Sequence, residues 1–374
     1  MTDNGSVSRP IKAVGILSSM DVWWVGDDFS VQGAYWSDGQ PWQRYQLAPP
    51  NSAMAFSIAA VSRIPTSMEI WWVGTEDRSV QGAYWYEGQS WQRYELAPPG
   101  SAHASSSIAA VSRIPTSMEV WWVADGSVQG AYWYEGQPWQ RYELAPPGSA
   151  HLTSSIAAVS RIPNSMEVWW IVGDGSVQGA YWYEGQSWQR YELAPPGSAH
   201  PTSSIAAVSR IPNSMEVWWE GHISSSYLDG DGSIHGAYWY EGQPWQRYQL
   251  APPDSACQGS KLAAVARIPT SMEVWWFGPP AFPVSGYSVQ GAYWYEGQPW
   301  QRYELEPPNL ASSRGDIIAV SRIPNSMEVW WTWQHTVQGA YWYEGQSWQR
   351  YQLAPPDSPS FAITALARKK FVVI

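Results

Sequence analysis

The motif YEGQ(P/S)W places a tyrosine and a tryptophan around a short turn, as Tyr134 and Trp139 illustrate. A carboxylate, Glu119, stands earlier in the same segment, behind the motif SRIPxSM. The π face of an aromatic ring attracts the slightly positive C–H bonds of a pyranose, and a carboxylate accepts hydrogen bonds from hydroxyl groups. The combination predicts a sugar site. The alternatives are packing between units for Trp139 and a surface ion pair for Glu119, and Arg113 is expected to pair with a carboxylate rather than bind a ligand.

These motifs recur along the whole chain. Each copy holds a WW pair, a QGAYW or HGAYW block and a WQRY block, and seven copies account for 28 of the 29 tryptophans. The WW pairs begin at Trp23, Trp71, Trp121, Trp169, Trp218, Trp275 and Trp330. The copies span about residues 11–50, 58–99, 108–147, 156–196, 205–253, 262–308 and 318–356, and residues 361–374 resemble a partial copy.

Each copy is predicted to form four short β-strands. In the third copy, segments rich in Val, Ile, Tyr and Trp lie between Pro, Gly, Asp or Asn at 108–114, 118–123, 127–134 and 139–144. No segment keeps a helical period, which excludes a parallel α/β sheet. The sequence therefore predicts an all-β protein, a single seven-bladed β-propeller of four-stranded antiparallel blades over residues 1–374.

The two ends of the chain leave the closure of the ring open. Residues 11–17 and 21–25 resemble the first two strands of the first copy. Residues 363–368 and 371–374 resemble the same two strands again, so closure is expected to involve the terminal copy. The sequence alone does not assign that copy a place.

Loop lengths separate the two faces of the predicted ring. The AYW and WQRY tryptophans are six residues apart in all seven copies, and the loop after the first strand is also constant wherever its arginine is present. The second Trp of WW and the Val or Ile directly before the QGAYW or HGAYW block are 6 to 15 residues apart. Loops after the first and third strands emerge on one face, which predicts function there. Recent duplication or tight turns are the alternative explanation.

Composition excludes several classes of protein. The formal charge is −11, and Lys and Arg cluster only at 368–370, so no nucleic-acid partner is predicted. No run of 18 apolar residues and no leader-like N-terminus occur. We therefore expect that the protein is made in the cytoplasm and does not insert into a membrane. Release to act outside the cell stays open.

Enzyme and metal chemistry find little support. His222, His235 and His335 are scattered and stand in no nucleophile or metal-ligand motif, so we predict neither catalysis nor a cofactor. The segment Asp229-Gly-Asp-Gly resembles a calcium loop only faintly, and no metal is predicted. The single cysteine, Cys257, replaces the His of the PPGSAH loops. We expect it to be exposed as a reactive thiol or as a disulfide in a homo-oligomer, with an inert thiol as the alternative.

The unit IAAVSRIPxSMEVWW followed by VQGAYWYEGQPWQRYEL resembles the blade of the fungal fucose-binding propeller lectins. The seven copies together resemble the Photorhabdus-type seven-bladed propeller lectins. The resemblance implies fucosylated or related glycans as partners, O-methylated sugars among them, bound between neighbouring blades. In the fungal pattern an Arg and a Glu of one blade face a Tyr and a Trp of the next. Carried over, the aromatic pair falls on Tyr134 and Trp139, with Glu69 and Ala83 in place of the polar pair, so that Ala83 would form an apolar wall.

This register pairs each carboxylate with the aromatic residues of the next copy. The predicted sets are Asp21 with Tyr86 and Trp91; Glu69 with Tyr134 and Trp139; Glu119 with Tyr183 and Trp188; Glu167 with Tyr240 and Trp245; Glu216 with Tyr295 and Trp300; and Glu273 with Tyr343 and Trp348. The closing set pairs Glu328 with Trp42 and has Ser37 where the tyrosine should be. The alternative function is a protein-binding scaffold, but seven similar grooves favour a small repeated ligand.

Overall fold

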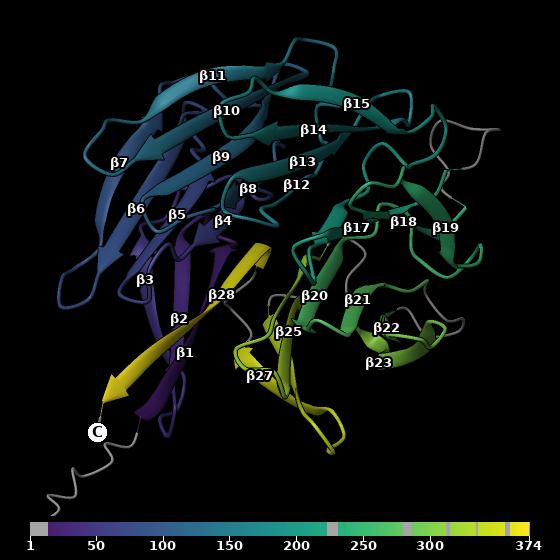
Figure 1. Ribbon diagram of the computed structural model, residues 1–374. Helices are drawn as coiled ribbons and strands as arrows, with labels where there is room; N and C mark the ends of the chain where they lie inside the picture. The colour runs from purple at the N-terminus through teal and green to yellow at the C-terminus, as the bar shows by residue number, and fades with distance from the viewer. Residues whose placement is uncertain are drawn as a thin grey trace, which may run out of the picture.

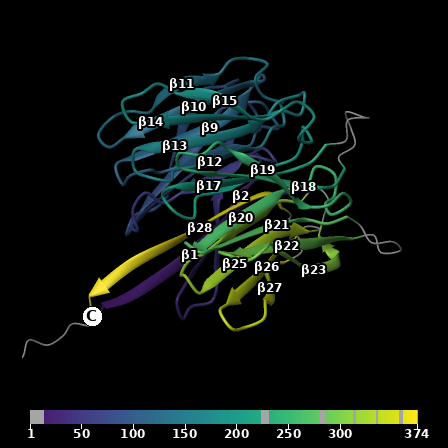
Figure 2. The ribbon, with the colours of Figure 1, turned by 45° about the vertical axis from the view of Figure 1, so that its right-hand side comes forward.

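A computed structural model describes residues 14–222, 231–279, 286–311, 315–333, 336–355 and 360–373. Seven four-stranded antiparallel sheets follow one another around a ring (Figures 1 and 2). The predicted seven-bladed propeller is thereby confirmed. Within these ranges, no helix combines the length and the apolar character that crossing a bilayer requires.

Blades 2 to 7 each use four consecutive strands. Blade 2 holds β4 (Ile58–Val61), β5 (Ser67–Val73), β6 (Val80–Tyr86) and β7 (Gln92–Ala97). Blade 3 holds β8 (Ile108–Val111), β9 (Ser117–Ala124), β10 (Ser127–Tyr134) and β11 (Gln140–Ala145). Blade 4 holds β12 (Ile156–Val159), β13 (Ser165–Ile171), β14 (Val177–Tyr183) and β15 (Gln189–Ala194). Blade 5 holds β16 (Ile205–Val208), β17 (Ser214–Glu220), β18 (Ile234–Tyr240) and β19 (Gln246–Ala251). Blade 6 holds β20 (Leu262–Ile268), β21 (Ser271–Phe277), β22 (Tyr287–Tyr295) and β23 (Gln301–Ala311). Blade 7 holds β24 (Ile317–Val320), β25 (Ser326–Trp333), β26 (Thr336–Tyr343) and β27 (Gln349–Ala354).

Blade 1 is assembled from both ends of the chain. Its order is β28 (Ser360–Val373), β1 (Val14–Gly26), β2 (Val31–Ser37) and β3 (Gln43–Ala48), so the terminal copy supplies the inner strand (Figure 1). Residues 14–17 do not form a separate first strand as expected, because they continue β1 without a turn. Residues 371–373 likewise continue β28, while residues 11–13 and 374 lie outside the described residues.

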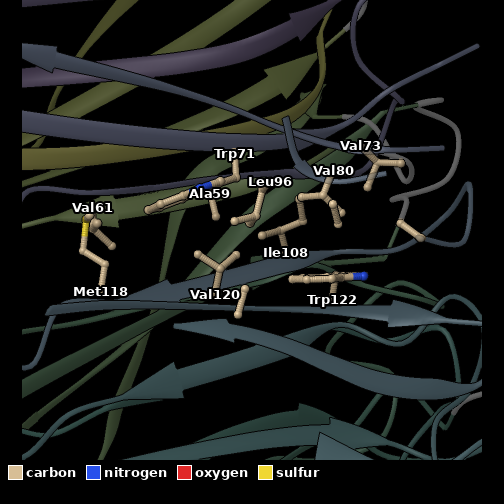
Figure 3. Close-up of a cluster of buried hydrophobic side chains, with 13 residues drawn as sticks. Ala59, Val61, Trp71, Val73, Val80, Leu96, Ile108, Met118, Val120 and Trp122 are labelled. Carbon is tan, nitrogen blue, oxygen red and sulfur yellow. The ribbon is translucent and has the colours of Figure 1, made fainter. Parts of the chain in front are cut away.

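The adjacent tryptophans of each WW pair pack in opposite directions, because successive side chains of a strand point to opposite faces. Trp71 of blade 2 and Trp122 of blade 3 lie in one buried cluster between these blades, with Val80, Leu96 and Ile108 (Figure 3). The indole of Trp122 donates a hydrogen bond of 2.8 Å to the Ser101 carbonyl of blade 2. The WW tryptophans thus pack between neighbouring blades and hold them together.

The inner strands surround a central channel of about 290 Å³. Small side chains such as Ala109 and Ala110 line it together with isoleucines of the same strands. At its end, Ser107 accepts a hydrogen bond of 2.8 Å from the Ile156 backbone amide, and Ser204 accepts one of 2.6 Å from that of Leu262. The inner strands are therefore linked around the ring by side chains as well as by packing.

Candidate functional site

In blades 2 to 7, the two constant loops lie side by side on one face. In blade 3, the Glu135 amide of the YEGQ turn donates a 2.9 Å hydrogen bond to the Thr116 carbonyl of the SRIPTSM loop. Gly136 takes φ of +80° in this turn, a conformation that glycine adopts without strain. The variable loops meet on the opposite face, where the Ala150 amide bonds the Gly126 carbonyl at 2.9 Å.

Between neighbouring blades, a groove opens along their outer strands. The groove between blades 4 and 5, the 4–5 groove, has a volume of about 330 Å³. Blade 4 contributes Glu167, Tyr181, Tyr183 and Tyr191, and blade 5 contributes Met215, Trp239 and Trp245. The 5–6 and 6–7 grooves have the same composition, with volumes of about 350 and 320 Å³. These volumes are those of small-ligand sites.

A tyrosine and a carboxylate form the floor of each groove. In blade 3, Tyr142 accepts a hydrogen bond of 2.8 Å from the Trp121 indole and donates one of 2.5 Å to Glu119 Oε1. Burial raises the pKa of Glu119 from 4.5 to about 7, against the Tyr142 hydrogen bond and the nearby Arg113 charge. The pKa of Glu167 rises to about 8 by the same cause. These carboxyl groups can therefore exchange a proton near neutral pH.

The WQRY tryptophan forms one wall of the groove. Trp245 stands edge-on to Trp169 of the preceding blade, at 6.0 Å between ring centroids, and lies nearly parallel to Tyr191 at 6.5 Å. The same edge-on contact joins Trp91 to Trp23, Trp139 to Trp71, Trp188 to Trp121, Trp300 to Trp218, Trp348 to Trp275 and Trp42 to Trp330. Each tryptophan thus reaches the groove of the carboxylate with which the sequence analysis paired it.

The tyrosines of the YEGQ turns lie in different grooves from those expected. Tyr183 lines the groove of Glu167, the carboxylate of its own blade, and its hydroxyl accepts a 2.6 Å hydrogen bond from Arg161. Tyr240, the expected partner of Glu167, lines the groove of Glu216. The reason is geometric: the tyrosine before the turn and the tryptophan after it face opposite sides of one blade.

The tyrosine assignment therefore moves by one blade. The sets brought together are Glu69 with Tyr86 and Trp139; Glu119 with Tyr134 and Trp188; Glu167 with Tyr183 and Trp245; Glu216 with Tyr240 and Trp300; Glu273 with Tyr295 and Trp348; and Glu328 with Tyr343 and Trp42. The closing 7–1 groove thus has its tyrosine. Ser37 instead falls in the 1–2 groove, with Asp21 and Trp91.

The arginine of SRIP also belongs to the groove. Arg113 donates to the Tyr134 hydroxyl at 2.9 Å and to the Pro163 carbonyl of blade 4 at 2.6 Å. Its guanidinium carbon lies 4.9 Å from the ring centroid of Trp182. The expected carboxylate partner is Glu184 at 3.8 Å, an exposed residue whose ion pair contributes little. Arg113 therefore joins two blades beside the groove.

The sequence analysis missed four residues that line the 4–5 groove: the floor tyrosine Tyr191 and, in the walls, Tyr181, Met215 and Trp239. Strand alternation could have found Tyr181, because Tyr181 and Tyr183 are two residues apart on one face of β14. Trp239, the tryptophan of the AYW block, also lines the groove. Ala83 is fully buried between blades 1 and 2 and forms no wall in the groove of Glu69.

Cys257 does not lie on the surface as expected. It is 5% exposed and packs in the cluster between blades 6 and 7, and burial raises the pKa of its thiol to about 12. The buried position therefore gives no support to a reactive thiol or to a disulfide with another subunit and favours the inert thiol.

No histidine that the structure describes lines one of the 4–5, 5–6 and 6–7 grooves. His235 stacks on Trp219 at 6.3 Å, and His222 lies 6.2 Å from His200. His335 and Asp229 fall outside the described residues. In the part of the chain that the structure describes, no three His, Cys, Asp or Glu side chains gather so that they could hold a metal ion.

Solved lectin structures share this architecture. The BP39L lectin from Burkholderia pseudomallei has a TM-score of 0.77 at 20% sequence identity, over 90% of this chain and 94% of the lectin. AofleA from Arthrobotrys oligospora has a TM-score of 0.57 at 14% identity, over 85% and 90%. The fungal Aleuria aurantia lectin, a six-bladed β-propeller, has a TM-score of 0.56 at 17% identity, over 83% and 99%. No family model and no curated protein matches. The chain therefore has the β-propeller fold of these lectins.

Proposed function

We propose that this protein is a lectin that binds fucose or related sugars, O-methylated ones included, in the grooves between its blades. The observation that carries the proposal is the repetition of one groove with aromatic walls around a buried carboxylate. A pyranose can stack its apolar face on Trp245 while its hydroxyl groups reach Glu167. Oε2 of Glu167 is buried and accepts no hydrogen bond from any residue that the structure describes, so a ligand hydroxyl that reached it would supply its missing partner.

The similar structures support a sugar ligand. The SapL1 lectin was solved with α-methyl fucoside, at a TM-score of 0.57 and 18% identity to this chain. The Aleuria aurantia structure is described as showing a novel mode of fucose recognition. The site proposed here needs no catalytic group, since stacking and hydroxyl hydrogen bonds suffice for binding.

Several grooves on one face make the proposed lectin multivalent. A shallow aromatic site should bind a monosaccharide weakly, with Kd on the order of 0.1 to 1 mM. Several such sites facing one dense glycan surface raise avidity about 10²–10⁴-fold, because later binding events become intramolecular.

The test compares two measurements on the same protein. Titration with methyl α-L-fucoside should give a weak Kd, whereas retention on a fucosylated surface should be far stronger and should be reversed by free sugar. A glycan array reports the preference among methylated and unmethylated sugars. Equal affinities in both formats would refute multivalency, and an array without any bound sugar would favour a protein-binding scaffold.

A further inference from the structure

The 1–2 groove is built at the same positions as the other six grooves but with different residues. Asp21 stands where the others have glutamate, and Ser37 stands where they have the turn tyrosine. Its arginine is Arg368, which the C-terminal strand β28 supplies at the position that Arg63 has in blade 2. Trp91 still stands edge-on to Trp23 at 6.0 Å, so the aromatic wall is retained.

The guanidinium of Arg368 has different partners from those of its counterparts. In the 3–4 groove, Arg113 donates a hydrogen bond to the Tyr134 hydroxyl, and Glu119 accepts one from the hydroxyl of the floor tyrosine, Tyr142. In the 1–2 groove, Nε and Nη2 of Arg368 both donate to Asp21 Oδ2, at 3.2 and 3.0 Å. One oxygen of this floor carboxylate is therefore held by the arginine, which in the other grooves donates to the turn tyrosine instead.

Without the turn tyrosine, the arginine of the 1–2 groove is more exposed to solvent. The side chain of Arg368 is 13% exposed, whereas those of its counterparts Arg63, Arg113, Arg161, Arg210 and Arg322 are 4% to 8% exposed. Ser37 is too short to cover the guanidinium. A sugar entering this groove would find the aromatic wall but not the turn phenol, and it would meet a shorter carboxyl group that Arg368 already holds through Oδ2.

Arg368 also joins segments that are distant along the chain. Besides Asp21 of β1, it bonds the Pro65 carbonyl of blade 2 at 3.4 Å, and its guanidinium lies 4.9 Å from the ring centroid of Trp85 in β6. The Asp21 carboxyl is 2% exposed, so removing its partner would leave a buried charge or a buried acid. These contacts fix β28 in the place of the inner strand.

We infer that the 1–2 groove is a latch that closes the ring and not a seventh copy of the sugar site, so that the chain has six equivalent sites. The number of sites in this inference rests on the proposed sugar-binding function. The inference assigns Asp21 and Ser37 as the residues that change the specificity of this groove.

The number of sugars bound per chain tests whether the 1–2 groove is a sugar site. Equilibrium dialysis with methyl α-L-fucoside at saturation should give six sugars per wild-type chain and five for Trp139→Ala, which damages the 2–3 groove. The double substitution Asp21→Glu with Ser37→Tyr should add one site and give seven. Crystals soaked with the same sugar should show the 1–2 groove empty in wild type. Seven sugars bound to wild type would overturn the inference, even if the double variant does not fold.

Thermal melts without any sugar test whether Arg368 holds the ring closed. Arg368→Lys keeps the charge but loses the two-point contact, and should lower Tm by several degrees more than Arg113→Lys does. Equal losses would overturn the latch. If no fucoside binds at all, the proposed function and the site count fail together, whereas the melts still decide whether Arg368 closes the ring.

Discussion

Trp139 stands edge-on to Trp71 of the preceding blade, with ring centroids 5.9 Å apart and ring planes at 85°. Tyr134, only five residues earlier, accepts a hydrogen bond from Arg113 on the opposite side of the same blade. One YEGQPW turn therefore serves two grooves, and each groove draws its tyrosine and its tryptophan from different turns.

This arrangement predicts how paired substitutions behave. Trp139→Ala with Tyr86→Ala changes the 2–3 groove alone and should remove one site. Trp139→Ala with Tyr134→Ala changes two grooves and should remove two. Equilibrium dialysis with methyl α-L-fucoside counts the sites, and near-UV circular dichroism verifies that both variants fold. Loss of one site in both variants would contradict the assignment of Tyr134 to the 3–4 groove.

A second prediction concerns Gly130, which lies against the floor tyrosine. A Cβ on Gly130 would be 2.4 Å from Cζ of Tyr142, so Gly130→Ala must displace the ring that bonds Glu119 and Trp121. We expect a loss of about 1–3 kcal/mol in the free energy of unfolding, measured by urea denaturation.

Truncating the floor tyrosine provides the control for that prediction. Tyr142→Leu alone should destabilise the protein, because it leaves the Trp121 indole and Glu119 without their hydroxyl partner. In the double variant with Gly130→Ala, the steric conflict disappears, so the total loss should be smaller than the sum of the two single losses. Strict additivity would show that the two residues do not compete for the same space.

The carboxylates of the groove floors predict how stability depends on pH. Burial raises the pKa of Glu69, Glu119 and Glu216 from 4.5 to about 7 in the folded chain. Between these pH values the folded state binds more protons than the unfolded state, so stability falls as pH rises. Tm should therefore be higher at pH 5 than at pH 8, by about 5 °C or more.

A single neutral substitution isolates one carboxylate. Glu119→Gln retains an acceptor for the Tyr142 hydroxyl but cannot ionise, so the fall in Tm between pH 5 and pH 8 should become smaller than in wild type. Glu135→Gln, at an exposed glutamate of the same blade, is the matched control and should leave the slope unchanged. An unchanged slope in Glu119→Gln would mean that this carboxyl is ionised throughout the range.

The thiol of Cys257 should be inert until the chain unfolds. Burial and the nearby Glu220 raise its pKa to about 12, so almost no thiolate exists at pH 8. A thiol reagent such as DTNB should react slowly with the native protein and rapidly in 6 M guanidinium. A dimer on a non-reducing gel of native protein, absent after Cys257→Ser, would contradict the buried position.

The strands, the blade count and the face with constant loops could be predicted from the sequence, because repetition displays each of them seven times. The partner of Tyr183 could not, because it depends on the side of the blade to which a residue before a turn points. Arg161 appeared to be a surface ion-pair residue, and only its bonds to Tyr183 and the Pro212 carbonyl place it in the groove. The location of residues 360–373 depends on pairing with β1, which lies more than 330 residues away and leaves no local pattern.

The use of a late strand to complete blade 1 sets an order on folding during synthesis. Asp21 leaves the ribosome 347 residues before its partner Arg368, while strands of blades 2 to 7 emerge next to the strands they pair with. Until β28 is made, β1 has an unpaired inner edge that any passing strand could join. The blade that is synthesised first is therefore the one that is completed last, and the nascent chain is most exposed to mispairing at its own beginning.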